Sequence, residues 1–186
     1  MVSTNRVYRL VLADGDQAIA KSSNYGSFFM FAEDHERLHL ATELLAGGPY
    51  ENFMAHILTR DGRPYLWYDG EMWVAFYAAI ELASGLPRQL SGGQVAQLGS
   101  EIGRFHRACE DIAPMLPPSS KSAKSDAVNL YERLASSEAS DVFGLDQSRI
   151  DLVRRHTHRF LIAAHEADYD SWPKIPVLID WNLGNF

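Results

Sequence analysis

Three Asp-Gly dipeptides lie within the first 70 residues of the 186-residue chain and constrain its fold more than any other feature. They are typical of tight β-hairpin turns and occur at residues 14–15, 61–62 and 69–70. The alternating or apolar runs on either side of these dipeptides predict strands over residues 7–13, 17–21, 52–59, 64–68 and 71–77. A helix is predicted over residues 32–45, closed by two glycines. The first 77 residues therefore indicate a small antiparallel sheet with one helix.

Helical patterns follow a linker that is predicted over residues 78–88. Ser91 and Gln94 fit a capping box at the start of a helix over residues 91–108, and Leu98, Ile102 and Phe105 give that helix an apolar stripe. An exposed loop at 114–126 precedes helices predicted at 126–138 and 147–167. We therefore expect an α+β fold, with a β-rich lobe at 1–77 and a helical lobe at 89–186.

Composition excludes several classes of protein. The 17 Lys and Arg against 24 Asp and Glu give a net charge of −7, which argues against a nucleic-acid surface. One cysteine, Cys109, excludes a disulfide within the chain and a cysteine-based zinc finger. The sequence has neither an apolar run near the ~20 residues that span a bilayer nor a signal-peptide pattern. We expect a cytoplasmic protein with no nucleic-acid or membrane partner.

The string His35-Glu-Arg-Leu-His39 matches the H-E-x-x-H pattern of zinc metallopeptidases. In that pattern two histidines one helical turn apart hold zinc, and the glutamate, here Glu36, activates water. No downstream pattern supplies a convincing third ligand. A solvated helix face explains the string more simply, and the zinc peptidase is kept as an alternative.

The string Leu90-Ser-Gly-Gly-Gln94 matches the signature of ABC transporter ATPases. Such proteins also need a P-loop, G-x-x-x-x-G-K-[ST], whose backbone N–H groups hold phosphates. None of the Lys-Ser pairs of this chain follows the required glycine. The capping box therefore explains the string without a nucleotide.

The most informative residues are Asp180 and Asn185, which follow an apolar run over residues 175–179. The D-x-x-x-x-N spacing suits phosphoryl transfer, because a carboxylate can orient a hydroxyl and accept its proton while an amide oxygen binds Mg²⁺. Aspartate and asparagine are common in loops, so the spacing gains its value from what precedes it.

The upstream order is that of a kinase. Lys21 ends a predicted strand, where its ammonium can neutralise nucleotide phosphates, and Glu33, Glu36 or Glu43 of the next helix can pair with it. Backbone groups of residues 75–79, with Phe76 and Ala78 among them, can meet adenine.

The chain resembles the aminoglycoside phosphotransferase and choline kinase group of protein-kinase-like enzymes. The resemblance rests on the first hairpin at 5–15, on the LGxxLxxxH-like helix at 98–106, and on the catalytic-loop-like string at 177–186. The hairpin at 69–77 is also similar to that of bacterial hexosamine kinases. These motifs cover nearly the whole chain in the family's order.

The resemblance implies a two-lobed kinase fold that uses ATP and Mg²⁺. It makes Asp180 the catalytic base, Asn185 a Mg²⁺ ligand and Lys21 the phosphate-binding lysine, with Glu36 as the preferred ion-pair partner. Ser3, Thr4 and Asn5 would lie in the nucleotide loop. The acceptor would be a hydroxyl of a small molecule, such as an amino sugar, a sugar or an aminoglycoside.

The sequence departs from the family pattern in two places. Leu178 and Ile179 stand where the family has His and Gly, and the family's second metal-binding aspartate would lie beyond Phe186. We therefore expect either an incomplete chain of a larger enzyme or a non-catalytic, pseudokinase-like nucleotide-binding protein.

Overall fold

The computed structural model describes residues 5–24, 26–80 and 89–177. An antiparallel sheet has the strand order β1-β2-β6-β5. Its strands are β1 (Asn5–Val11), β2 (Gln17–Ser23), β5 (Leu66–Tyr68) and β6 (Trp73–Ala78). A small second sheet joins β3 (Thr59–Arg60) to β4 (Arg63–Pro64). An N-terminal antiparallel sheet with one helix, followed by a mostly helical part, confirms the predicted α+β class.

The helices are α1 (Phe28–Leu45), α2 (Gly92–Ile112), α3 (Ala123–Ala135), α4 (Ala139–Phe143) and α5 (Gln147–Glu166). Two 3₁₀ turns follow α2 and α5, at Ala113–Met115 and Tyr169–Ser171. No helix among these described residues is long and apolar enough to cross a membrane.

All three Asp-Gly dipeptides lie in the turns that the sequence predicts. The glycine of each has a positive φ, which glycine adopts without steric cost. At the β3–β4 turn both Asp61 and Gly62 have positive φ, of 54° and 74°, as a type I′ turn requires. The hairpins are therefore determined by local backbone chemistry.

The strand predicted over residues 52–59 is largely absent. Ile57 makes one bridge to Tyr77, and only β3 at the end of the segment is regular strand. The apolar side chains before it pack on a helix instead: the ring of Phe53 lies 4.8 Å from that of Phe105, and Met54 is buried. The apolar side chains of this segment cover α2. An alternating strand pattern does not reveal which surface such side chains will cover.

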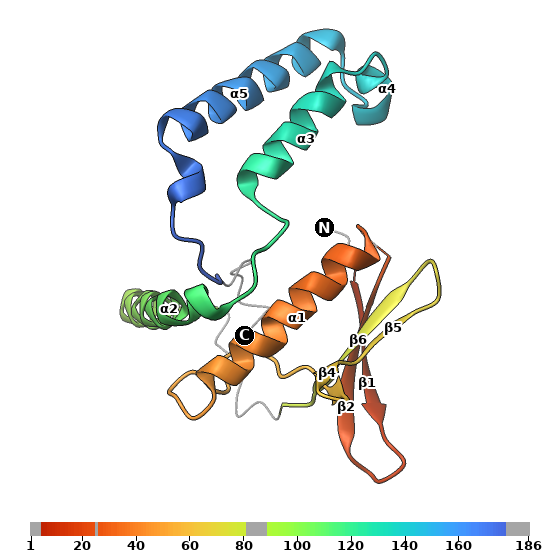
Figure 1. The fold of residues 1–186 in the computed structure, drawn as a ribbon, viewed down its shortest axis with the longest axis vertical. Coiled ribbons are helices and arrows are strands. Elements are labelled where there is room, and N and C mark those ends of the chain that lie inside the picture. The colour runs from red at the N-terminus through yellow and green to blue at the C-terminus, as the bar shows by residue number, and fades with distance from the viewer. Residues whose placement is uncertain (1–4, 25, 81–88, 178–186) are drawn as a thin grey trace. The chain divides into compact units, whose positions relative to one another are not determined.

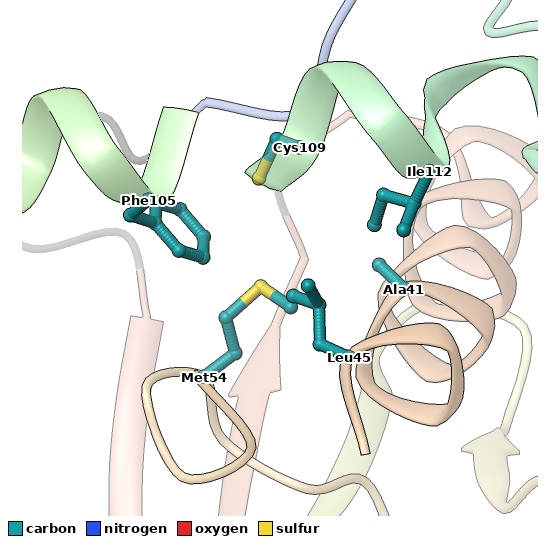
Figure 2. Packing of buried hydrophobic residues seen from close by; sticks show 6 residues of the cluster. All are labelled: Ala41, Leu45, Met54, Phe105, Cys109 and Ile112. Atoms are coloured by element: carbon teal, nitrogen blue, oxygen red, sulfur yellow. The ribbon is translucent and has the colours of Figure 1, made fainter. Parts of the chain in front are cut away.

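Helix α2 packs against α1 through the largest buried cluster (Figures 1 and 2). Phe105, Cys109 and Ile112 lie on one face of α2 and meet Ala41 and Leu45 of α1, and Met54 joins them from the loop between α1 and β3. The capping box of α2 is present, because the Ser91 hydroxyl accepts from the backbone N–H of Gln94 and the Gln94 side chain accepts from the backbone N–H of Ser91. The structural interpretation of the Ser-Gly-Gly-Gln string is confirmed.

Helices α3 and α5 lie side by side, with the short α4 between them in sequence (Figure 1). Leu134, Ala139 and Ile150 form the buried centre of this part. Helix α3 begins before the predicted residue 126, because Ser122 caps it by accepting from the N–H of Ser125.

The chain divides into two compact units, one of residues 1–118 with 174–186 and one of residues 119–173. Helix α2 belongs to the unit that contains the sheet. The predicted linker lies mostly at residues 81–88, outside the described residues. The lobe boundaries proposed from the sequence therefore stay a prediction.

Candidate functional site

Strands β2 and β6 hold three of the predicted nucleotide-site residues in one sheet. Lys21 of β2 lies opposite Ala75 of β6. Phe76 and Ala78 follow Ala75 along β6. Because consecutive side chains of a strand point to opposite faces, Lys21 lies on one face and the side chains of Phe76 and Ala78 lie on the other.

Some of the backbone groups that are predicted to bind adenine already form hydrogen bonds within the fold. The N–H of Leu58 donates to the carbonyl of Phe76 at 2.7 Å, and the N–H of Ala78 donates to the carbonyl of His56 at 2.9 Å. Residues 75–78 also pair with β2 along their length, so the predicted adenine contacts depend on backbone groups at the end of β6 and at Ala79.

The face of the sheet that carries Lys21 is the one that α1 covers. Trp73 and Tyr77 lie on this face, two residues to either side of Ala75, and the ring of Phe31 in α1 lies 5.6 Å from that of Trp73. Lys21 is half-buried there, and no carboxylate of the described ranges forms an ion pair with it. An ammonium held on a strand without a counter-ion is suited to bind an anion.

Trp73 adds a buried donor that the sequence analysis missed. Its side chain is 3% exposed, and its Nε1 atom has no hydrogen-bond partner among the described residues. Trp73 and Lys21 are diagonal neighbours on one face, since Trp73 lies opposite Ser23 and Lys21 opposite Ala75. Such neighbours are typically about 7–8 Å apart. A buried indole N–H usually finds an acceptor, so an acceptor group bound here would relieve a cost of folding.

Glu36, the predicted partner of Lys21, is exposed on α1. The preceding residue, His35, is buried and faces the sheet. Within the described chain no ion pair joins Lys21 to Glu33, Glu36 or Glu43. The choice of Glu36 stays a prediction, and forming the pair would require a different arrangement of these side chains.

Both ring nitrogens of His35 have partners in the fold. Nδ1 lies 2.6 Å from the carbonyl oxygen of Phe31, and Nε2 lies 2.6 Å from the hydroxyl of Tyr77. In the neutral ring Nδ1–H donates to the carbonyl and Nε2 accepts from Tyr77. Neither nitrogen is open to zinc, and no group of three potential ligands for a metal ion occurs among the described residues. His35 is therefore held by packing, which corrects the prediction that the H-E-x-x-H string lies on a solvated helix face; Glu36 of the string is exposed, as that prediction requires.

The remaining predicted site residues are only partly placed. Asn5 begins β1, opposite Ser23 of β2. Ser3, Thr4, Asp180 and Asn185 lie outside the described residues. Ile175, from the apolar run before Asp180, is half-buried and packs against the cluster between α1 and α2. Ile175 therefore attaches the start of the predicted apolar run to the unit that holds Lys21, and residues 178 and 179 of the run lie outside the described residues.

Comparisons of the chain with family models, with curated proteins and with solved structures found no match.

Proposed function

We propose that this chain has a protein-kinase-like fold and transfers the γ-phosphate of ATP to a hydroxyl of a small molecule. The observation that carries the proposal is Lys21, half-buried on a central strand, on the face that α1 covers, with no carboxylate partner in the described ranges. The order of hairpin, helix, hairpin and helices, followed by the D-x-x-x-x-N spacing, supports the same proposal.

The chemistry around Lys21 fits a phosphate-bearing ligand. The ammonium supplies a charge-assisted contact, and on the same face the buried Nε1–H of Trp73 is a donor without an acceptor among the described residues. ATP with Mg²⁺ would supply the transferable phosphoryl group and neutralise its charge. We assign Lys21 to hold the phosphates, Asn185 to bind the metal and Asp180 to orient the acceptor hydroxyl and take its proton. An amino sugar, a sugar or an aminoglycoside is the proposed acceptor.

Asp180→Asn tests this proposal, because it keeps the shape of the side chain but removes the proton acceptor. Phosphate transfer from ATP to a panel of amino sugars and aminoglycosides is measured with the complete encoded protein, beside a titration with an ATP analogue. We expect the rate to fall by ~10²–10⁴-fold, since that is the usual contribution of a general base. Nucleotide affinity should hardly change, and the exposed control Asp111→Asn should leave both unchanged.

The two measurements separate the alternatives. Transfer at the parent rate by Asp180→Asn would refute the assigned base. Nucleotide binding without transfer by the parent protein would instead favour a non-catalytic nucleotide-binding function. Stoichiometric zinc in the purified protein would be needed to revive the metallopeptidase, against the bonding of His35.

A further inference from the structure

Helix α5 carries a cationic cluster that the proposed kinase chemistry does not use. Arg154, Arg155, His158 and Arg159 recur at the one-turn spacing that places side chains on one side of a helix. Together with Tyr131 of α3 they line a solvent-open hollow of about 500 Å³. We name these five residues the arginine pocket.

The charge of the pocket is only partly balanced. Arg154 contacts Asp151 at 3.2 Å. Arg155 and Arg159 are exposed and have no ion-pair partner within the described residues. Residues 152–162 contain no Asp or Glu. Like charges one turn apart destabilise a helix, so this concentration of arginine in a chain of net charge −7 is a local cost that a bound anion would remove.

The donors of the pocket suit a phosphate group. A guanidinium offers paired N–H donors that match two oxygens of a phosphate, and the pocket holds three of them. Tyr131 and His158 add aromatic surface, with ring centroids 5.5 Å apart at an interplanar angle of 85°. A hollow of this size lies within the range of small-molecule sites and exceeds what a bare phosphate ion fills.

We propose that the arginine pocket binds a small phosphorylated organic molecule. Arg155 and Arg159 would hold the phosphate, and the rings of Tyr131 and His158 would contact the organic part. The pocket and the Lys21 site are built from different residues, because those of the pocket all belong to the unit of residues 119–173 whereas Lys21 belongs to the other unit. If the pocket does not bind such a molecule, the proposed kinase function is therefore unaffected.

The test is equilibrium binding measured by calorimetry with three probes: glucose 6-phosphate, inorganic phosphate and glucose. We expect the parent protein to bind glucose 6-phosphate more tightly than inorganic phosphate and to show no binding of glucose. The double variant Arg155→Gln/Arg159→Gln should lose affinity for the phosphate ester by about tenfold or more. Arg149→Gln, which changes an arginine of the same helix outside the pocket, is the matched control and should bind as the parent does.

Folding and site assignment are checked in the same experiment. Thermal unfolding must show that the Arg155→Gln/Arg159→Gln variant is folded. If it is not, Arg155→Lys/Arg159→Lys, which keeps the charge, takes its place. Lys21→Met should leave glucose 6-phosphate binding unchanged. The proposal is overturned if glucose 6-phosphate does not bind at about 10 mM, if it binds no better than inorganic phosphate, or if the double variant binds it like the parent. It is equally overturned if binding is lost in Lys21→Met, or if only a long polyanion such as an oligonucleotide binds.

Discussion

The Nε2 atom of His35 lies 2.6 Å from the hydroxyl of Tyr77, and this buried hydrogen bond joins α1 to β6 across 42 residues of sequence. The other ring nitrogen bonds to the carbonyl of Phe31, one turn earlier in α1. The pair therefore connects the single helix of the N-terminal region to the face of the sheet that carries Lys21. A histidine that resembles a metal ligand in the sequence thus has a structural role.

Tyr77→Phe should lower the free energy of unfolding by about 1–3 kcal/mol, because it leaves a buried ring nitrogen of His35 without a donor. Tyr8→Phe, at an exposed position of the same sheet, is the control and should have little effect. Urea denaturation of both variants beside the parent measures the difference. Equal stability of Tyr77→Phe and Tyr8→Phe would show that the bond contributes nothing.

The free energy of unfolding should fall at alkaline pH because Tyr77 ionises. Burial raises the pKa of Tyr77 from its ordinary 10.0 to about 12, so the folded state keeps a proton that the unfolded state has lost between these values. The stabilisation is complete below pH 10, declines as pH rises, and is gone above about pH 12; it amounts to about 2–3 kcal/mol. Burial also raises the pKa of the Cys109 thiol, from 9.0 to about 11, which adds a decline that begins near pH 9.

Unfolding of the parent and of Tyr77→Phe at a series of alkaline pH values separates the two groups. The Cys109 contribution is common to both proteins, whereas the Tyr77 contribution exists in the parent alone. The stability difference between them should therefore shrink as pH rises above 10. A difference that stays constant up to pH 12 would contradict the assignment to Tyr77.

Ser91→Ala should lower stability by about 1 kcal/mol, since it removes the hydroxyl that accepts from the backbone N–H of Gln94 at the start of α2. Ser100→Ala, at an exposed position within the same helix, should cost less. Thermal unfolding gives the comparison, and a nucleotide titration runs beside it. Loss of nucleotide binding at an unchanged melting temperature would reopen a ligand role for the Ser-Gly-Gly-Gln string.

Lys21→Met should weaken the binding of an ATP analogue by roughly tenfold or more, because a charge-assisted contact to phosphate contributes ~1.5–3 kcal/mol. Methionine keeps much of the bulk of the half-buried side chain. Lys121→Met, in an exposed loop of the other unit, is the matched control. An unchanged titration in a folded Lys21→Met variant would remove Lys21 from the proposed nucleotide site.

Trp73 and Glu36 show which features of the candidate site the sequence pattern does not predict. A tryptophan in an alternating strand indicates a core residue, and nothing in the pattern reveals that no acceptor for its Nε1–H lies within the described part of the chain. The family resemblance makes Glu36 the preferred partner of Lys21, yet the residue that α1 turns toward the sheet is its neighbour His35. One residue rotates a helical position by about 100°, so an inferred partner depends on how the whole helix is packed.

The sequence by itself determined the features that depend on a few neighbouring residues. The Asp-Gly turns, the cap of α2 at Ser91, and a sheet region with one helix ahead of a mostly helical region all follow from local backbone preferences and short-range hydrogen bonds. Tertiary structure alone decided which surface each segment covers. It turned residues 52–56 into a loop against α2, paired His35 with Tyr77, and brought Tyr131 to the arginines of α5. Those outcomes depend on side chains that are distant in sequence, and only packing of the whole chain places them together.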